Sequence, residues 1–143
     1  PNSKFVASFI GQVNVVNGVV RKGEIYVKNT NIKIESEPQN EWTDGDIVLL
    51  VRPEDIVIKE KSEKGKHLPA IINRIHYRGN HYEIDCSVNG IEVKLIEYKR
   101  SKFLENWTNK QTIFLQFNSY RIFRAEEGHE QLREKLKENG YIE

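Results

Sequence analysis

The chain has 143 residues, of which 38% are hydrophobic and 30% are charged. This balance is typical of an ordinary globular protein, and it excludes a disordered or membrane-embedded chain. The 22 basic and 21 acidic residues leave a net charge of +1, which argues against a protein that holds nucleic acid mainly by electrostatic attraction.

The single cysteine, Cys86, cannot form an intrachain disulfide, and the chain has no cysteine pair to build a zinc site. This usage fits a reducing compartment. Because Cys86 alternates with Ile84 and Val88, we expect a buried, inert thiol. No apolar run approaches the roughly 20 residues that a membrane-spanning helix needs.

The first third of the chain predicts short strands joined by tight turns. The valines from Val13 to Val20 favour strands, interrupted by Asn17-Gly18 as a turn. Further turns are predicted at residues 21–23 and 29–31, because glycine and asparagine accept turn conformations.

Residues 35–46 are polar and predict a surface loop. The continuous apolar run Ile47–Val51 favours a strand buried on both faces, and Pro53 ends it because proline cannot donate to a sheet. After this break, a further short strand is predicted at residues 56–58. The mixed charges of residues 59–67 favour a solvated hairpin loop.

The second half continues the pattern with strands at 68–77, 81–88, 91–96, 112–117 and 122–123. Asn89-Gly90 predicts a type I′ hairpin turn. In the charged stretch 97–111, the expected anchors are Phe103, Leu104 and Trp107.

A helix is expected over residues 126–139, where Leu132 and Leu136 are four residues apart and Gly140 suits a helix end. About ten short strands and one terminal helix predict an all-β barrel or sandwich.

Motifs for catalysis are absent from the sequence. There is no GxxxxGK[ST] phosphate-binding loop, no GxGxxG, no HExxH, no GxSxG and no EF-hand loop. His76 and His81 flank one turn and could hold a metal with Glu83, but we expect solvent-facing histidines there. The sequence therefore predicts no enzyme, no metal and no cofactor in this chain.

Three segments carry a resemblance to a known family. They are residues 5–14 (FVASFIGQVN), residues 51–56 (VRPEDI) and residues 70–79 (AIINRIHYRG). The chain resembles the C-terminal domain of the ATP-binding subunits of ABC importers, in the group that serves maltose-type sugars, polyamines, ferric iron and sulfate or molybdate. The matching motif residues, which we expect to shape the fold rather than to touch a ligand, are Phe9, Gly11, Asn14, Arg52, Pro53, Glu54, Asp55 and Gly79.

This resemblance implies an OB-like barrel known as the transport-associated OB (TOBE) domain. Residues 1–143 would be one such domain, with a first barrel portion at 5–60, a second at 68–124 and the helix at 126–139. The ATPase half, with its phosphate-binding loop, would lie before Pro1, so the chain would be a fragment.

The resemblance also implies a function, that of a non-catalytic regulatory and dimerisation domain. The implied partners are a second copy of the ATPase subunit, a transmembrane permease reached through the nucleotide-binding domain, and an effector that is a small molecule or a protein. The implied location is cytoplasmic and peripheral, on the inner face of the cell membrane. The sulfate-type branch is the most similar over residues 5–18.

An alternative is a free-standing OB-like module that binds a small oxyanion or single-stranded nucleic acid. Oxyanion sites use backbone N–H groups at turns, helped by basic side chains. The candidates near turns are Arg21, Lys22, Arg52 and Arg78. Nucleic acid is the less favoured ligand, since acidic residues are interleaved with the basic ones.

Overall fold

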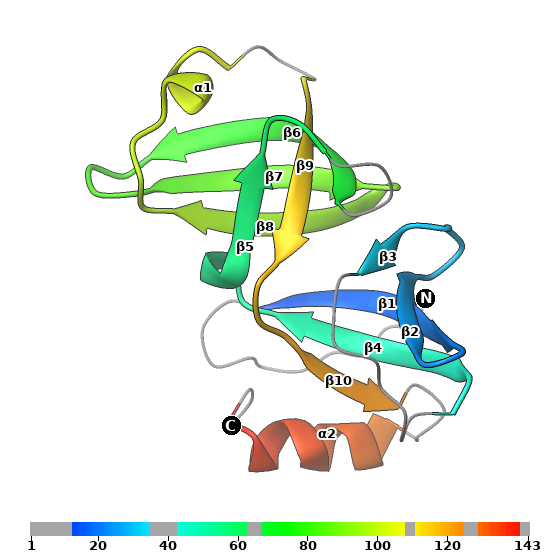
Figure 1. Cartoon of the computed structure of the whole chain (residues 1–143). Coiled ribbons are helices and arrows are strands. Elements are labelled where there is room, and N and C mark those ends of the chain that lie inside the picture. The colour runs from blue at the N-terminus through cyan, green and yellow to red at the C-terminus, as the bar shows by residue number, and fades with distance from the viewer. Residues whose placement is uncertain (1–12, 35–42, 63–66, 108–110, 125–128, 141–143) are drawn as a thin grey trace.

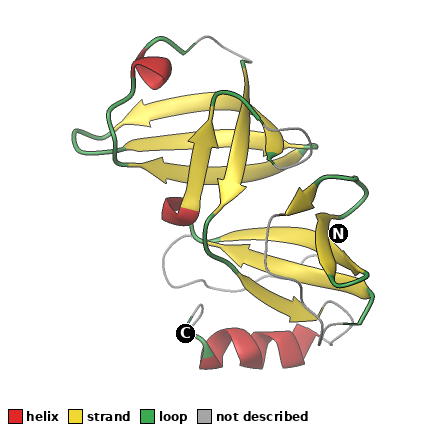
Figure 2. Cartoon of the chain, in the orientation of Figure 1, coloured by secondary structure: helices red, strands yellow, loops and turns green. Residues whose placement is uncertain are grey.

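Two five-stranded antiparallel sheets account for most of the described residues (Figures 1 and 2). The computed structural model describes residues 13–34, 43–62, 67–107, 111–124 and 129–140. The first sheet has the order β10-β4-β1-β2-β3 and the second has the order β5-β9-β6-β7-β8. The strands are β1 (Asn14–Arg21), β2 (Glu24–Val27), β3 (Lys33–Ile34), β4 (Gly45–Val51), β5 (Ile56–Lys59), β6 (Leu68–Tyr77), β7 (Tyr82–Val88), β8 (Ile91–Glu97), β9 (Thr112–Phe117) and β10 (Arg121–Arg124). The expected all-β class with about ten short strands is confirmed.

The chain crosses between the two sheets twice. It leaves the first sheet after β4 through a single 3₁₀ turn, η1 (Pro53–Asp55), and it returns after β9 to place β10 beside β4. Each sheet therefore contains strands that the chain adds after it has crossed over. The strand β5 pairs with β9 in the second sheet, and β10 belongs to the first.

The turns predicted at residues 21–23 and at Asn89-Gly90 are both present, and each closes a hairpin. Lys22 and Gly23, at the β1–β2 turn, have φ values of 51° and 76°. Asn89 and Gly90, at the β7–β8 turn, have φ values of 50° and 81°. Positive φ at both central residues is the type I′ arrangement, whose twist matches that of the flanking strands.

The turn predicted at Asn17-Gly18 is wrong, because β1 runs through both residues without a break. Gly18 faces Val27 on one neighbouring strand and Ile47 on the other. A Cβ atom at Gly18 would lie 3.1 Å from the Tyr26 carbonyl oxygen. The glycine therefore serves close packing inside the sheet rather than a change of direction.

One hydrophobic core joins the inward faces of both sheets. The strand β4 is buried on both faces, as its apolar run predicted: Ile47, Leu49 and Val51 enter this core, while Val48 and Leu50 point the other way. Helix α2 (His129–Glu138) lies along this second side, below β10 in Figure 1, and its Leu136 is buried.

A short helix, α1 (Lys102–Glu105), was missed by the sequence prediction. The hydroxyl of Ser101 caps it by accepting a hydrogen bond from the Leu104 amide. Leu104 is buried, and both Phe103 and Trp107 pack against the core, so the three expected anchors are confirmed. Among the described residues no helix is long and apolar enough to cross a membrane. The expected helix start at 126 lies outside the described residues.

Candidate functional site

The motif residues Asn14 and Arg52–Asp55 meet where the two sheets join, although they are far apart in the sequence. Asn14, the first residue of β1, pairs with Val51, the last residue of β4. The η1 turn that follows packs against β8 of the second sheet. We call this junction the seam.

The side chain of Asn14 bonds the edge of the second sheet. Its Nδ2 donates to the Lys94 carbonyl oxygen at 2.8 Å, and its Oδ1 accepts from the Lys94 amide at 2.8 Å. Since β8 is an edge strand, the Asn14 amide extends its hydrogen bonding as a further strand would. Asn14 is buried, with 7% of its surface exposed, so these bonds also satisfy its own polar atoms.

The η1 turn brings the two crossings of the chain together. Pro53 is buried at its start, and the Asp55 amide donates to the Arg52 carbonyl oxygen at 2.9 Å. On the returning crossing, the Asn118 amide donates to the Asp55 carbonyl oxygen at 2.8 Å. Glu54 is exposed. The VRPED segment therefore redirects the chain from one sheet to the other and anchors its return.

Three motif residues lie away from the seam. Gly79 sits in the turn between β6 and β7 with a φ of 95°, and nothing lies within 4 Å of a Cβ atom placed there. Its backbone angle, not crowding, is the reason for glycine. Phe9 and Gly11 lie outside the described residues.

The four basic candidates for an oxyanion site do not converge. Arg21 and Lys22 are exposed at the β1–β2 turn, Arg52 is at the seam and Arg78 is at the β6–β7 turn. The Arg78 Nε atom lies 3.0 Å from Glu83 Oε1, and this hydrogen bond is the main reason that the pKa of Glu83 is lowered.

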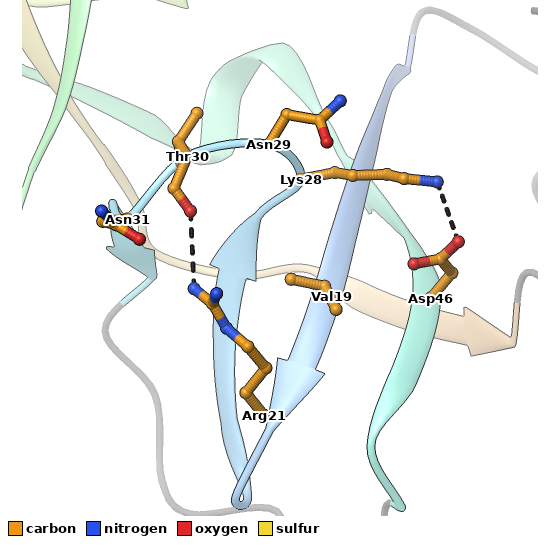
Figure 3. A pocket seen from close by; sticks show the side chains of 7 residues that line it. All are labelled: Val19, Arg21, Lys28, Asn29, Thr30, Asn31 and Asp46. Atoms are coloured by element: carbon orange, nitrogen blue, oxygen red, sulfur yellow. Dashed lines mark hydrogen bonds and ion pairs between the residues drawn. The ribbon is translucent and has the colours of Figure 1, made fainter.

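A shallow polar groove of about 350 Å³ adjoins Arg21 at the end of the first sheet (Figure 3). Arg21 reaches across it toward the Thr30 carbonyl oxygen at 3.5 Å, and Lys28 forms an ion pair with Asp46 at 2.8 Å. Sequence reasoning missed Lys28, although it directly precedes the predicted turn at 29–31. Both cations already have oxygen partners, so an anion in this groove would compete with them.

The remaining sequence candidates lie in separate places. His76 is exposed, whereas His81 Nε2 is 3.5 Å from Glu83 Oε2. The described part of the chain holds no group of three His, Cys, Asp or Glu side chains that could bind a metal ion. Cys86 is fully buried as expected, and burial is the main cause that raises the pKa of its thiol to about 12.

The η1 turn of the seam and most of the strands lie within one family match. The sequence pattern of the TOBE domain matches residues 49–124, from β4 through the second sheet to β10. The chain belongs to the TOBE domain family. The resemblance found in the motifs is thereby confirmed.

Relatives of this TOBE domain are ATP-binding subunits of importers. The chain is 32% identical over 90 residues to the Fe(3+) ions import ATP-binding protein FbpC of Pasteurella multocida, covering 63% of the chain and 25% of that protein. It is 31% identical over 98 residues to the spermidine/putrescine import ATP-binding protein PotA of Bacteroides fragilis, covering 68% of the chain and 21% of that protein. The chain thus spans a quarter or less of the length of these two relatives.

A solved structure shares the fold. The cytoplasmic molybdate-binding protein ModG, solved with molybdate bound, superposes with a TM-score of 0.60 over 80% of this chain and 98% of the ModG chain. The sequence identity is 13%, so this likeness supports the OB-like architecture alone.

Proposed function

We propose that this TOBE domain is a non-catalytic regulatory and dimerisation module of the ATP-binding subunit of an ABC importer. The observation that carries the proposal is the family match over residues 49–124, in a chain whose relatives FbpC and PotA are named import ATP-binding proteins. The seam supports a regulatory role, because hydrogen bonds and a shared core couple the two sheets. A displacement of one sheet would therefore move the other.

The proposal also implies which partners the domain has and where in the cell it works. A second copy of the same subunit would contact this domain, and the permease would be reached through a nucleotide-binding domain. The subunit would work on the cytoplasmic face of the membrane. The motif residues of the seam would act by holding the domain's shape, and the chain as a whole, residues 1–143, would be one regulatory unit.

The first test is to read the coding DNA upstream of the Pro1 codon. A continuous open frame that encodes GxxxxGK[ST] supports the proposal, and a stop codon followed by an initiator next to Pro1 contradicts it.

The second test is biochemical. The chain of 143 residues is expected to show no ATP hydrolysis above buffer and to sediment with a concentration-dependent mass, while an enzyme-like rate of hydrolysis would refute the proposal.

Oxyanion binding is a second candidate, favoured by the ModG fold and by the groove beside Arg21. We infer that a site there would distinguish molybdate from sulfate at constant ionic strength in calorimetric titrations. Arg21→Gln should weaken that binding, whereas Arg78→Gln, at the far turn, should not. Equal heats for both anions, unaffected by Arg21→Gln, would remove this candidate.

A further inference from the structure

Three Asn-Gly sequences occur in the chain: Asn17-Gly18, Asn89-Gly90 and Asn139-Gly140. An asparagine followed by glycine is prone to deamidation, because glycine has no side chain to keep its backbone nitrogen away from the asparagine side chain. The first two have almost the same neighbours, Val-Asn-Gly-Val and Val-Asn-Gly-Ile. Their local sequences therefore predict nearly equal reactivity, and a difference between them has to come from the fold.

Deamidation needs the backbone nitrogen of the glycine to reach the side-chain carbonyl carbon of the asparagine. That nitrogen attacks the carbon and forms a new C–N bond, and the side-chain amide nitrogen leaves as ammonia with the proton that the glycine nitrogen loses. Water then opens the resulting succinimide ring at either of its carbonyl carbons. The products are aspartate and isoaspartate, and in isoaspartate the main chain runs through the former side chain. The reaction therefore requires rotation at the asparagine and a glycine amide that no hydrogen bond holds in place.

The fold leaves Asn89-Gly90 at the tip of the β7–β8 hairpin. Both residues are exposed, with φ values of 50° and 81°, and the last pair of the ladder is Val88 with Ile91. A Cβ atom placed on Gly90 would have nothing within 4 Å. Rotation at Asn89 therefore displaces only the two residues of the turn, and exposed loop tips open at little cost in free energy.

Asn17-Gly18 lies in the middle of β1, with a paired strand on each side. Gly18 is buried opposite Val27 of β2 and Ile47 of β4. The Asn17 carbonyl oxygen accepts a hydrogen bond from the Lys28 amide at 3.0 Å. Rotation at Asn17 would break the pairing of the central strand on both sides, so the sheet protects this asparagine although its side chain is exposed.

Asn139-Gly140, directly after α2, is held by two hydrogen bonds. The Gly140 amide donates to the Lys137 carbonyl oxygen at 3.1 Å, and the Asn139 Oδ1 atom accepts from the Arg121 guanidinium. Neither group can react until these bonds break. The protection is weaker than in β1, because a helix end opens more easily than the centre of a sheet.

We propose that Asn89 is a modification site, at which the native domain deamidates to isoaspartate and aspartate ahead of its other Asn-Gly sequences. The new carboxylate lowers the net charge of +1 by one unit. Isoaspartate also adds a carbon atom to the main chain of a two-residue type I′ turn, whose geometry sets the register of β7 against β8. Since β8 carries Lys94, whose backbone bonds Asn14 at the seam, isoaspartate at this tip loosens the coupling of the two sheets.

This inference does not rest on the importer role, because the reaction needs only the folded chain and water. Its failure would leave the family-based proposal standing. The reverse also holds, because the upstream reading frame says nothing about the hairpin.

Incubation of the 143-residue chain in mildly alkaline buffer tests the proposal, with peptide mapping by a fragmentation method that distinguishes isoaspartate from aspartate. In the folded chain we expect Asn89 to react about tenfold or more faster than Asn17, with Asn139 between them. In guanidinium chloride the rates of Asn17 and Asn89 should become equal, since only the fold separates them. Equal rates at Asn17 and Asn89 in the folded chain, fastest reaction at Asn139, or a preference for Asn89 that persists in guanidinium chloride would each overturn the proposal.

Variants separate the modification from its consequence. Asn89→Gly keeps a residue that accepts positive φ but removes the reactive side chain, so it should form acidic species on ageing more slowly than the parent chain. The matched control Asn17→Ala should age as the parent chain does. If Asn89→Gly forms acidic species at the parent's rate, Asn89 is not the main site of deamidation.

Freshly prepared Asn89→Asp has the added charge without the longer main chain. It should therefore melt at a higher temperature than the isoaspartate form of the parent chain, isolated by ion exchange. Equal melting temperatures would refute the effect given to the longer turn.

Discussion

Replacing Asn14 with leucine should break the hydrogen bonds that hold the two sheets at the seam. The two atoms of the Asn14 amide bond the Lys94 amide and carbonyl at 2.8 Å each, across 80 residues of sequence. Leucine is close in size to asparagine but can neither donate nor accept. The change therefore leaves two backbone groups of β8 without the partners they have now.

The magnitude follows from those two groups. Each backbone group left unsatisfied in a buried place costs about 1–3 kcal/mol, so the pair costs about 2–6 kcal/mol. Burying the leucine side chain stabilises the fold by about 1.5–3 kcal/mol, which offsets part of that cost. The middles of these two ranges, about 4 and about 2 kcal/mol, leave a fall of about 2 kcal/mol in the free energy of unfolding. That is a sizeable share of the roughly 5–15 kcal/mol typical of a domain.

Urea denaturation followed by far-UV circular dichroism measures this loss. The matched control is Asn17→Ala, since Asn17 lies on the same strand with its side chain exposed, and alanine keeps the backbone oxygen that accepts from the Lys28 amide. That control should stay within about 0.5 kcal/mol of the parent chain. If Asn14→Leu is as stable as Asn17→Ala, the seam bonds do not hold the sheets together.

Three further predictions rest on single buried or paired groups. Gly18→Ala should lower the melting temperature, because the added Cβ would lie 3.1 Å from the Tyr26 carbonyl oxygen; an unchanged melting curve would show that β1 can shift to make room. Cys86 should resist iodoacetamide at about pH 8 in the native state and react once the chain is unfolded in urea, since burial raises its pKa to about 12; equal labelling rates would contradict this. Burial raises the pKa of Asp85, but hydrogen bonds from Lys94 and Arg74 outweigh burial and hold that pKa below the ordinary 3.8. A lowered folded-state pKa stabilises the fold above that ordinary value, and the contribution is lost as the pH falls through the folded value. Asp85→Asn should thus be less stable than the parent near neutral pH, with a difference that shrinks below about pH 4; a difference independent of pH would refute the pairing.

Local sequence determined the strands and most of the turns of this domain. Alternating β-branched residues predicted β1, β2 and β6–β9 because a half-buried pleated surface selects them residue by residue. Asn89-Gly90 marked a hairpin turn because both central positions of that turn require positive φ, which asparagine and glycine accept readily. The motif segments identified the family for a similar reason, since each is short and contiguous.

Tertiary structure alone decided what those segments do together. Asn17-Gly18 has a turn sequence, yet packing against Tyr26 and Ile47 keeps it inside a strand. The exchange of β5 and β10 between the sheets depends on pairings that span the chain, which no local pattern encodes.

The seam depends on the same long-range pairings. The amide of Asn14 meets Lys94 only because β1 and β8 come together at the seam. Residue type set the chemistry that each side chain can offer. The fold set which of those chemistries stand within bonding distance, because hydrogen bonds and ion pairs act over a few ångströms whatever the separation in sequence.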